Sequence, residues 1–180
     1  MNALELFGVI SGIASIIGLI YAVYYAKQSK KQKLLAYDRS APLPLATALS
    51  PEKDYKMQIL FQRGDSQEQR LQGVHVFFLR FANFGTEPIR KDDIAPGNKL
   101  RVEIEGTKVL DIGLTSVSRN VCNITISPAE EKGAFLTFDF LDFKDGALLK
   151  ILTEGRPEKA RLLGDIIGMP QGIKTTDSLS

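Results

Sequence analysis

The sequence predicts an all-β soluble domain, a β-sandwich or alternatively a barrel, preceded by one transmembrane α-helix. First, residues 7–26 form an apolar run without a charge. Second, short apolar runs separated by turn residues recur about every 8–12 residues after residue 33, which is the spacing of sandwiches and barrels. Third, apolar and polar residues alternate within several runs, as in Leu100–Glu105, which is the period of a strand.

The N-terminal run predicts a retained membrane anchor. As a helix it would span about 30 Å, the thickness of the hydrocarbon core of a bilayer. Lysines follow the run and no Lys or Arg precedes it, which is the reverse of a signal peptide and places the N-terminus outside the cell membrane. We therefore expect an extracytoplasmic segment at 1–6, a transmembrane helix at 7–26, a basic juxtamembrane segment at 27–33, a cytoplasmic β domain at 34–174 and a flexible tail at 175–180.

Small residues share one face of this predicted helix. Gly8 and Gly12 form a GxxxG pair, and small side chains let membrane helices approach closely. We expect the helix to assemble as a homo-oligomer or to pack against a membrane protein partner, and whether such an assembly forms a pore is left open. The predicted helix-association residues are Gly8, Ser11, Gly12, Ser15, Gly18 and Ala22.

The basic residues are concentrated next to the predicted helix. Four of the 23 basic residues and one of the 21 acidic residues lie in 1–33, so residues 34–180 are close to neutral. This distribution argues against general nucleic-acid binding. Each Lys near an anionic membrane surface contributes about 1 kcal/mol of attraction, so membrane lipids are expected partners. The predicted headgroup contacts are Lys27, Lys30, Lys31 and Lys33.

Candidate strands follow one another along the rest of the chain. Turn sequences such as Asn83-Phe-Gly-Thr-Glu-Pro88 and Ser127-Pro128 separate them. Helical turns are indicated at Glu130–Glu131 and Arg156–Leu163. The expected strands are Leu34–Asp38, Tyr55–Phe61, Val74–Ala82, Leu100–Glu105, Val109–Ser116, Cys122–Ile126, Phe135–Phe140, Ala147–Leu152 and Arg161–Ile167.

Four stretches carry a resemblance to a known layout. After the apolar helix and lysines come Leu34-Leu-Ala-Tyr37, the long motif running from Phe77 through Asn83-Phe-Gly-Thr-Glu-Pro to Ile94, the acid-Gly turn in Asp142–Leu152, and Leu163-Gly-Asp-Ile-Ile-Gly168. Their order resembles an uncharacterised family of bacterial single-pass membrane proteins with a cytoplasmic β-sandwich domain. The layout is also similar in outline to bacterial antiviral effectors that sense a nucleotide signal and perturb the membrane. The resemblance implies an architecture and no catalytic residue.

Few residues offer catalytic chemistry. His75 alternates with apolar neighbours and is interpreted as a strand side chain, and Cys122 as a small buried hydrophobe. Asp139, Asp142 and Asp145 lack the spacing of an EF-hand loop, and the first two would point to opposite faces of a strand. We expect no catalytic residue, no metal site and no cofactor, and the chain is interpreted as not an enzyme.

Basic side chains in the β domain are the remaining candidates for binding. Arg80 interrupts an apolar run, and planar guanidinium groups suit carboxylate or phosphate. The sequence therefore predicts a membrane-anchored effector or sensor that oligomerises through its helix and binds a partner or a small anionic (nucleotide) ligand, in one version acting in antiviral defence by disrupting the membrane. The alternative is an adaptor or assembly subunit of a larger membrane complex. The candidate anion-binding residues are Arg80, Arg90, Lys91, Arg156, Lys159 and Arg161.

Overall fold

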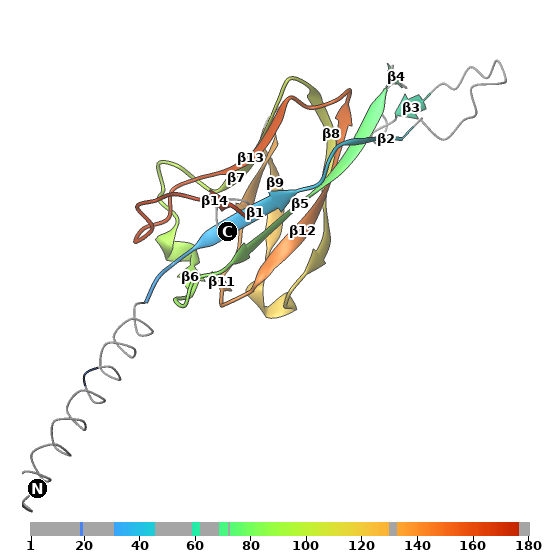
Figure 1. Ribbon diagram of the computed structural model, residues 1–180. Helices are drawn as coiled ribbons and strands as arrows, with labels where there is room; N and C mark the ends of the chain where they lie inside the picture. Colours follow the sequence, from blue (N-terminus) through green and yellow to red (C-terminus); the bar gives the residue numbers. More distant parts are fainter. Residues whose placement is uncertain are drawn as a thin grey trace, which may run out of the picture. The chain divides into compact units, whose positions relative to one another are not determined.

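The computed structural model describes Leu19 and residues 31–45, 59–61, 69–71, 73–129 and 133–176 (Figure 1). The chain divides into two compact units, Met1–Lys31 and Gln32–Ser180. In the first unit, Leu19 is helical and exposed, and the rest of the predicted transmembrane segment lies outside the described residues. Among the residues that the structure describes, no helix has the length and apolar character needed to cross a membrane.

The second unit is a mostly-β domain with several sheets. Its regular elements are strands and two short 3-10 helices, η1 (Lys91–Asp93) and η2 (Asn120–Cys122). The strands are β1 (Leu35–Arg39), β2 (Leu43–Pro44), β3 (Ile59–Phe61), β4 (Gln69–Leu71), β5 (Val74–Asn83), β6 (Ile89–Arg90), β7 (Arg101–Glu105), β8 (Lys108–Val117), β9 (Thr125–Ala129), β10 (Gly133–Thr137), β11 (Phe140–Leu141), β12 (Gly146–Glu154), β13 (Lys159–Leu163) and β14 (Lys174–Thr175).

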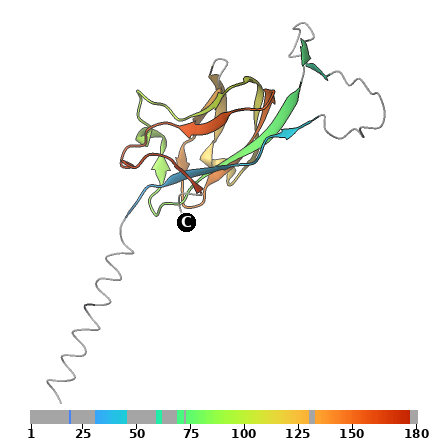
Figure 2. The same ribbon diagram turned by 45° about the horizontal axis from the view of Figure 1, so that its top comes forward.

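Two larger sheets form the body of this domain (Figures 1 and 2). The first sheet has the order β14-β1-β5-β12-β8, with β2 paired to β5, and the second has the order β13-β7-β10-β9. Two-stranded pairs β11-β6 and β3-β4 accompany them. In the first sheet β5 and β12 are antiparallel from Val74↔Glu154 to Ala82↔Gly146, whereas β1 and β14 are parallel.

One hydrophobic core takes side chains from both sheets. The alternation of each strand supplies them: in β5 Phe77, Leu79 and Phe81 are buried, while Arg80 between them is exposed. The second sheet contributes alternate positions in the same way, for example Val102 and Ile104 of β7. Burying one such side chain stabilises the fold by about 1.5–3 kcal/mol.

Five of the predicted strands are confirmed, and other predictions are wrong in whole or in part. Strands β1, β5, β7, β8 and β12 lie where the sequence predicts strands, to within two residues at each end. The helical turn predicted at Arg156–Leu163 is wrong, because Lys159–Leu163 forms β13 and pairs with β7. The strand predicted at Cys122–Ile126 is wrong in its first half, because η2 ends at Asn123 in the left-handed region (φ 48°), which Asn tolerates.

Short strands also shift the predicted boundaries. The run Phe135–Phe140 is divided between β10 and β11, and β11 pairs with β6 in a different sheet. Thr175, assigned from sequence to the tail, lies in β14 opposite Tyr37. Of the predicted strand Tyr55–Phe61 the structure describes residues 59–61 as β3, and Glu130–Glu131 lies outside the described residues.

Candidate functional site

The end of the β domain at which the chain enters through Gln32–Leu34 is here called the junction end. The entering segment is hydrogen-bonded to the loop after β5. The amide of Phe84 donates to Leu34 O at 2.7 Å, and the amide of Glu87 donates to Gln32 O at 3.2 Å. The amide of Gln32 in turn donates to Thr86 Oγ1 at 3.1 Å. These bonds fix the backbone on the domain side of the unit boundary at Lys31.

Gly85 allows this close approach. A Cβ at Gly85 would lie 2.1 Å from Gln32 O and 2.6 Å from Leu34 N, both backbone atoms. Any side chain there would push the entering segment off the loop, so glycine is required by the contact itself and not by a left-handed backbone.

Lys33 is held at the junction end by an ion pair. Its Nζ lies 2.7 Å from Asp93 Oδ1, and the two side chains are only 12% and 19% exposed. Lys33 Nζ also donates to Ile167 O at 3.4 Å, and Asp93 Oδ2 accepts the amide of Arg90 at 2.7 Å. Burial raises the pKa of Asp93, but the hydrogen bonds from Lys33 and from the Arg90 amide outweigh it, so the pKa lies below its ordinary value.

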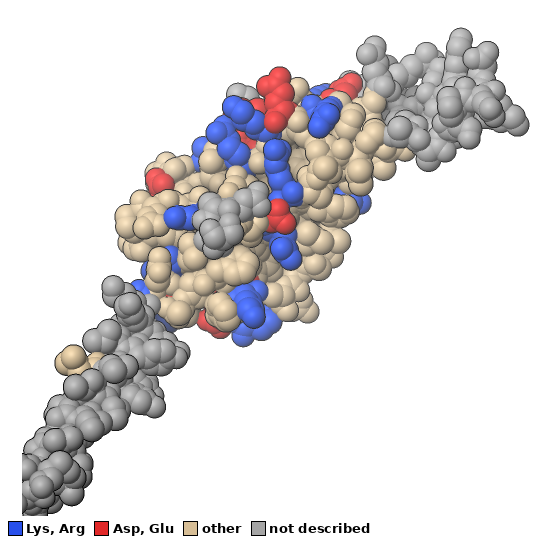
Figure 3. Space-filling view, viewed as in Figure 1, with Lys and Arg blue, Asp and Glu red and all other residues tan. Residues whose placement is uncertain are grey.

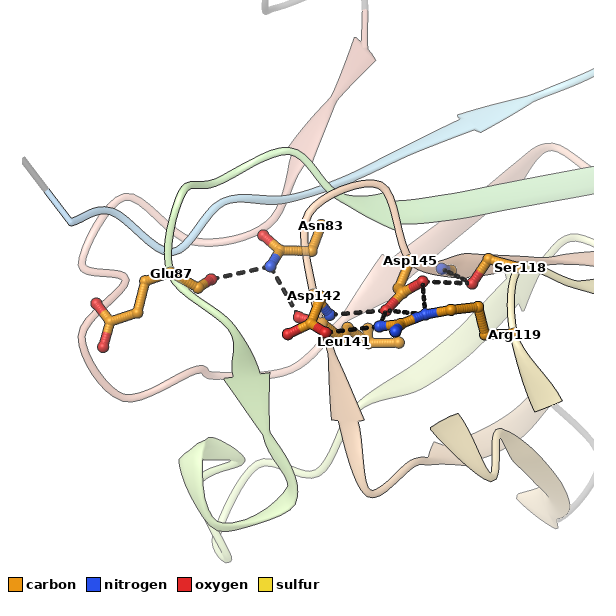
Figure 4. A network of polar contacts seen from close by, with 8 residues as sticks. Asn83, Glu87, Ser118, Arg119, Leu141, Asp142 and Asp145 are labelled. Carbon is orange, nitrogen blue, oxygen red and sulfur yellow. Dashed lines mark hydrogen bonds and ion pairs between the residues drawn. The ribbon is translucent and has the colours of Figure 1, made fainter. Parts of the chain in front are cut away.

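Asn83, which is fully buried at the end of β5, joins the loop after β5 to β11 and the turn that follows it (Figure 4). Its Nδ2 donates to Glu87 O and to Leu141 O, each at 2.9 Å, and its Oδ1 accepts the amide of Gly85 at 2.9 Å. The backbone of Asn83 bonds the β11–β12 turn, because its amide donates to Asp145 O and its carbonyl accepts the amide of Lys144. One side chain therefore ties together the loop that receives Gln32 and the turn before β12.

Arg119 joins the next loop to that turn (Figure 4). Its Nη2 lies 2.6 Å from Asp142 Oδ2 and also contacts Asp145 Oδ2, while its Nε donates to Asp145 Oδ1 at 2.9 Å. Ser118 Oγ donates to Asp145 Oδ1 and accepts the amide of Gly146, each at 3.0 Å. Asp145 is buried, so these charge-assisted hydrogen bonds join the loop after β8 to the β11–β12 turn from inside the domain.

The protonation states at this network are fixed near neutral pH. The hydrogen bond from Arg119 is the main cause that lowers the pKa of Asp145 to about 2, and those from the Asp142 amide and Ser118 act in the same direction. Hydrogen bonds to Asp145 and Asp142 raise the pKa of Arg119. Burial, followed by the charge of Asp145, raises the pKa of the Cys122 thiol. Arg119 and Asp145 therefore hold opposite charges in place at pH 7.

The structure describes only part of the residues predicted for the membrane. All six helix-association residues lie outside the described residues, as do Lys27 and Lys30. Lys31 is exposed, as expected of a lipid contact. The ammonium of Lys33 is instead occupied by Asp93, so lipid binding is proposed below for the other three lysines only.

The six candidate anion-binding residues are not brought into one site. Arg80 lies on the outer face of the first sheet, 3.8 Å from Asp38, and Lys159 and Arg161 both contact Glu105. Arg90 and Lys91 are exposed at the start of η1. Figure 3 shows basic and acidic side chains interspersed on the face that carries β1 and β13.

Arg156 has a different environment. It lines a hollow of about 350 Å³ together with Arg39, Pro42, Pro157 and Glu158. Arg39 comes from the end of β1 and Arg156 from the β12–β13 turn. Neither guanidinium forms an ion pair with a described residue, whereas Arg80, Arg101 and Arg161 all do.

The two other residues weighed for chemistry lie in strand and core positions. His75 is in β5, as predicted, and its buried Nδ1 has no hydrogen-bond partner among the described residues. Cys122 is fully buried, which confirms its interpretation as a small buried hydrophobe. Within the described ranges no group of three or more His, Cys, Asp or Glu side chains could hold a metal ion.

The sequence analysis missed the residues that build the junction end. It identified Asn83-Phe-Gly-Thr-Glu-Pro88 as a turn but gave Asn83 no role, and it did not connect Arg119 with Asp142 and Asp145. Comparison with protein families, curated proteins and solved structures finds no match.

Proposed function

We propose that the chain is a non-enzymatic effector or sensor, anchored in the cell membrane by residues 7–26, whose cytoplasmic β domain binds a signal or partner and transmits it through Gln32–Leu34. The observation that carries the proposal is the docking of Gln32–Leu34 on the junction end. A tether needs only a flexible linker, whereas backbone hydrogen bonds and the Lys33–Asp93 ion pair would pass a rotation or clustering of the domain on to the preceding segment.

In this proposal, copies of the chain assemble through the small-residue face of the predicted transmembrane helix. Ligand binding to the β domains would cluster them. The attached helices would then reorganise and permeabilise the membrane. Membrane permeabilisation is one way in which such a protein could act in antiviral defence. Lys27, Lys30 and Lys31 would hold the junction against anionic lipid headgroups. The shared core of the two sheets further supports a β-sandwich in place of a closed barrel.

Expression of the full chain in bacteria tests coupling and assembly together. We expect dye uptake and slowed growth on expression or activation, and loss of both with Gly12→Leu, because a bulky residue separates the helices. A flexible Gly-Ser insertion between Lys31 and Gln32 should reduce permeabilisation while leaving the unfolding midpoint of the domain unchanged. Cross-linking that finds monomers under every condition would contradict the proposal.

The alternative function, an adaptor or assembly subunit, makes the opposite prediction. An adaptor would be harmless when expressed alone, would co-purify with a larger membrane protein, and would tolerate the Gly-Ser insertion. Deletion of residues 1–26 would abolish toxicity for an effector and co-purification for an adaptor.

A small anionic ligand, a nucleotide or inorganic phosphate, is the signal that the β domain supports best. The hollow lined by Arg39 and Arg156 offers two guanidinium groups that form no ion pair with a described residue, and its one acidic lining residue, Glu158, leaves a net positive charge. We expect phosphate or a nucleotide to raise the melting temperature of the wild type and of the control Lys108→Ala, an exposed position on β8, but not of Arg156→Ala. An equal shift in all three proteins, or none in the wild type, would exclude this site.

A further inference from the structure

We propose that the junction end is itself a lipid-contacting surface, through four exposed apolar side chains that rest in the interfacial region of the bilayer. This inference rests on the membrane attachment proposed above and names the surface of the β domain that faces the lipid. The four residues, here called the rim, are Phe84, Val121, Phe143 and Ile167.

Two rim residues flank the entering chain. Phe84 is 37% exposed, and its amide is bonded to Leu34 O. Ile167 is 56% exposed, and its carbonyl accepts Lys33 Nζ. Each is therefore hydrogen-bonded to a residue within three positions of Lys31, the first residue of the predicted basic segment that the structure describes.

The other two rim residues lie on the neighbouring loops. Phe143 is in the β11–β12 turn, which the Lys144 amide bonds to Asn83 O at 2.7 Å. Val121 is in η2, next to Cys122, whose carbonyl accepts the Asp139 amide at 2.9 Å. Both side chains are 58% exposed, so four separate loops at one end of the domain each present a large apolar residue to solvent.

The chemistry around the rim matches a membrane interface. Lys144 Nζ lies 5.1 Å from the centroid of the Phe143 ring, and interfacial protein surfaces typically combine Phe or Leu side chains with Lys or Arg. Lys31 and Lys91 are also exposed here. Exposed Asp92, Asp139 and Asp165 share the same end and balance these cations, so the proposed contact is apolar insertion and not electrostatic adsorption.

The opposite end provides a matched comparison within the same domain. Leu43 is 60% exposed and lies opposite Val76, seven residues before Asn83 along β5. At about 3.3 Å per residue, this places Leu43 roughly 23 Å from the junction end. A fluorescent side chain at position 43 should therefore stay in water, whereas one at a rim position should contact lipid.

Tryptophan fluorescence in reconstituted full-length protein tests the proposal. The chain contains no Trp, so Phe143→Trp and Leu43→Trp each introduce a single probe. The proteins would be placed in phosphatidylcholine vesicles with and without brominated acyl chains, which quench Trp on contact. We expect the Phe143→Trp emission to be at least halved by the brominated lipid and the Leu43→Trp emission to be unchanged, with equal unfolding midpoints for the two variants.

Two other outcomes separate the rim from the membrane attachment on which it rests. If the proteins float with the vesicles but Phe143→Trp is quenched no more than Leu43→Trp, the rim proposal is overturned and the anchor stands. If the proteins do not float with the vesicles, both the anchor and the rim are wrong.

Discussion

The two ends of the β domain are held together by different means. At the junction end, side chains bond residues far apart in sequence: Asn83 bonds Leu141 across 58 positions, and Arg119 bonds Asp145 across 26. The opposite end also has long-range side-chain bonds, because Thr107 Oγ1 donates to Glu154 O across 47 positions and Arg161 contacts Glu105, whose side chain is 36% exposed. The buried hydroxyl of Thr153 there bonds only Gly155 O, two positions away. The difference is therefore that buried polar side chains, Asn83 and Asp145, make the long-range bonds where the chain enters, so the loops of the junction end are held in a fixed arrangement from within the domain.

Removal of the Asn83 side chain should lower the free energy of unfolding more than any other change proposed here. Asn83→Ala deletes three hydrogen bonds and leaves the Leu141 and Glu87 carbonyls and the Gly85 amide without that partner. We expect a loss of about 3 kcal/mol in the free energy of unfolding at pH 7, against about 1 kcal/mol for Thr153→Val. Urea unfolding of both variants measures the difference, and equal losses would show that the two ends are held equally.

Acid should weaken the junction end through Asp145. Its pKa in the folded protein, about 2, is below the unfolded value of about 3.9. A depressed folded pKa contributes stability that is present above the unfolded pKa and is lost as pH falls through the folded one, so the loss lies between about pH 4 and pH 2.

The contribution of Asp145 is about 2–3 kcal/mol, since one pKa unit corresponds to about 1.4 kcal/mol. We expect Asp145→Asn to lower the free energy of unfolding by about this amount at pH 7 and by much less at pH 2. The measurement is urea unfolding of wild type and variant at both pH values. A difference between them that does not change with pH would show that the charge of Asp145 does not stabilise the fold.

The Lys33–Asp93 pair tests the docking of the entering segment alone. Lys33→Met keeps the length of the side chain and removes its charge, and we expect a loss of about 1 kcal/mol because the pair is largely buried. Hydrogen exchange should accelerate at the Phe84 and Glu87 amides, which donate to the segment. A double-mutant cycle with Asp93→Asn isolates the pair, and a coupling energy near zero would mean that the backbone bonds hold the segment without it.

Sequence reasoning succeeded where structure depends on local pattern. Buried residues alternate from Phe77 to Asn83 in β5 and from Ala147 to Thr153 in β12, so a local pattern marks both strands before their partners are known. Strands of two residues, such as β6 and β14, have no pattern of their own and exist because a distant strand pairs with them. The same reason explains the failure at Arg156–Leu163, where pairing with β7 overrides helix-forming residues.

The junction end was beyond sequence reasoning for a related reason. Asp142 and Asp145 were examined as a metal loop, but their partner is Arg119, whose position only the fold reveals. Lys33 was grouped with the other juxtamembrane lysines because charge order cannot distinguish a lysine that contacts lipid from one that pairs with Asp93. The Asn83-Phe-Gly turn did carry a local signal, since Asn followed by Gly two residues later favours a side-chain-capped turn.

Removal of the Arg80 side chain should change the free energy of unfolding least, because its ion pair is exposed and lies away from the junction end. Its guanidinium lies 3.8 Å from Asp38, but both side chains are about half exposed or more, in the middle of the first sheet. Exposed pairs contribute at most about 1 kcal/mol and are screened by salt, so Arg80→Ala should change the free energy of unfolding by less than about 0.5 kcal/mol. Urea unfolding beside Lys33→Met measures this. Equal losses in the free energy of unfolding for Arg80→Ala and Lys33→Met would contradict this expectation. They would show that neither burial nor position at the junction end strengthens the Lys33–Asp93 pair.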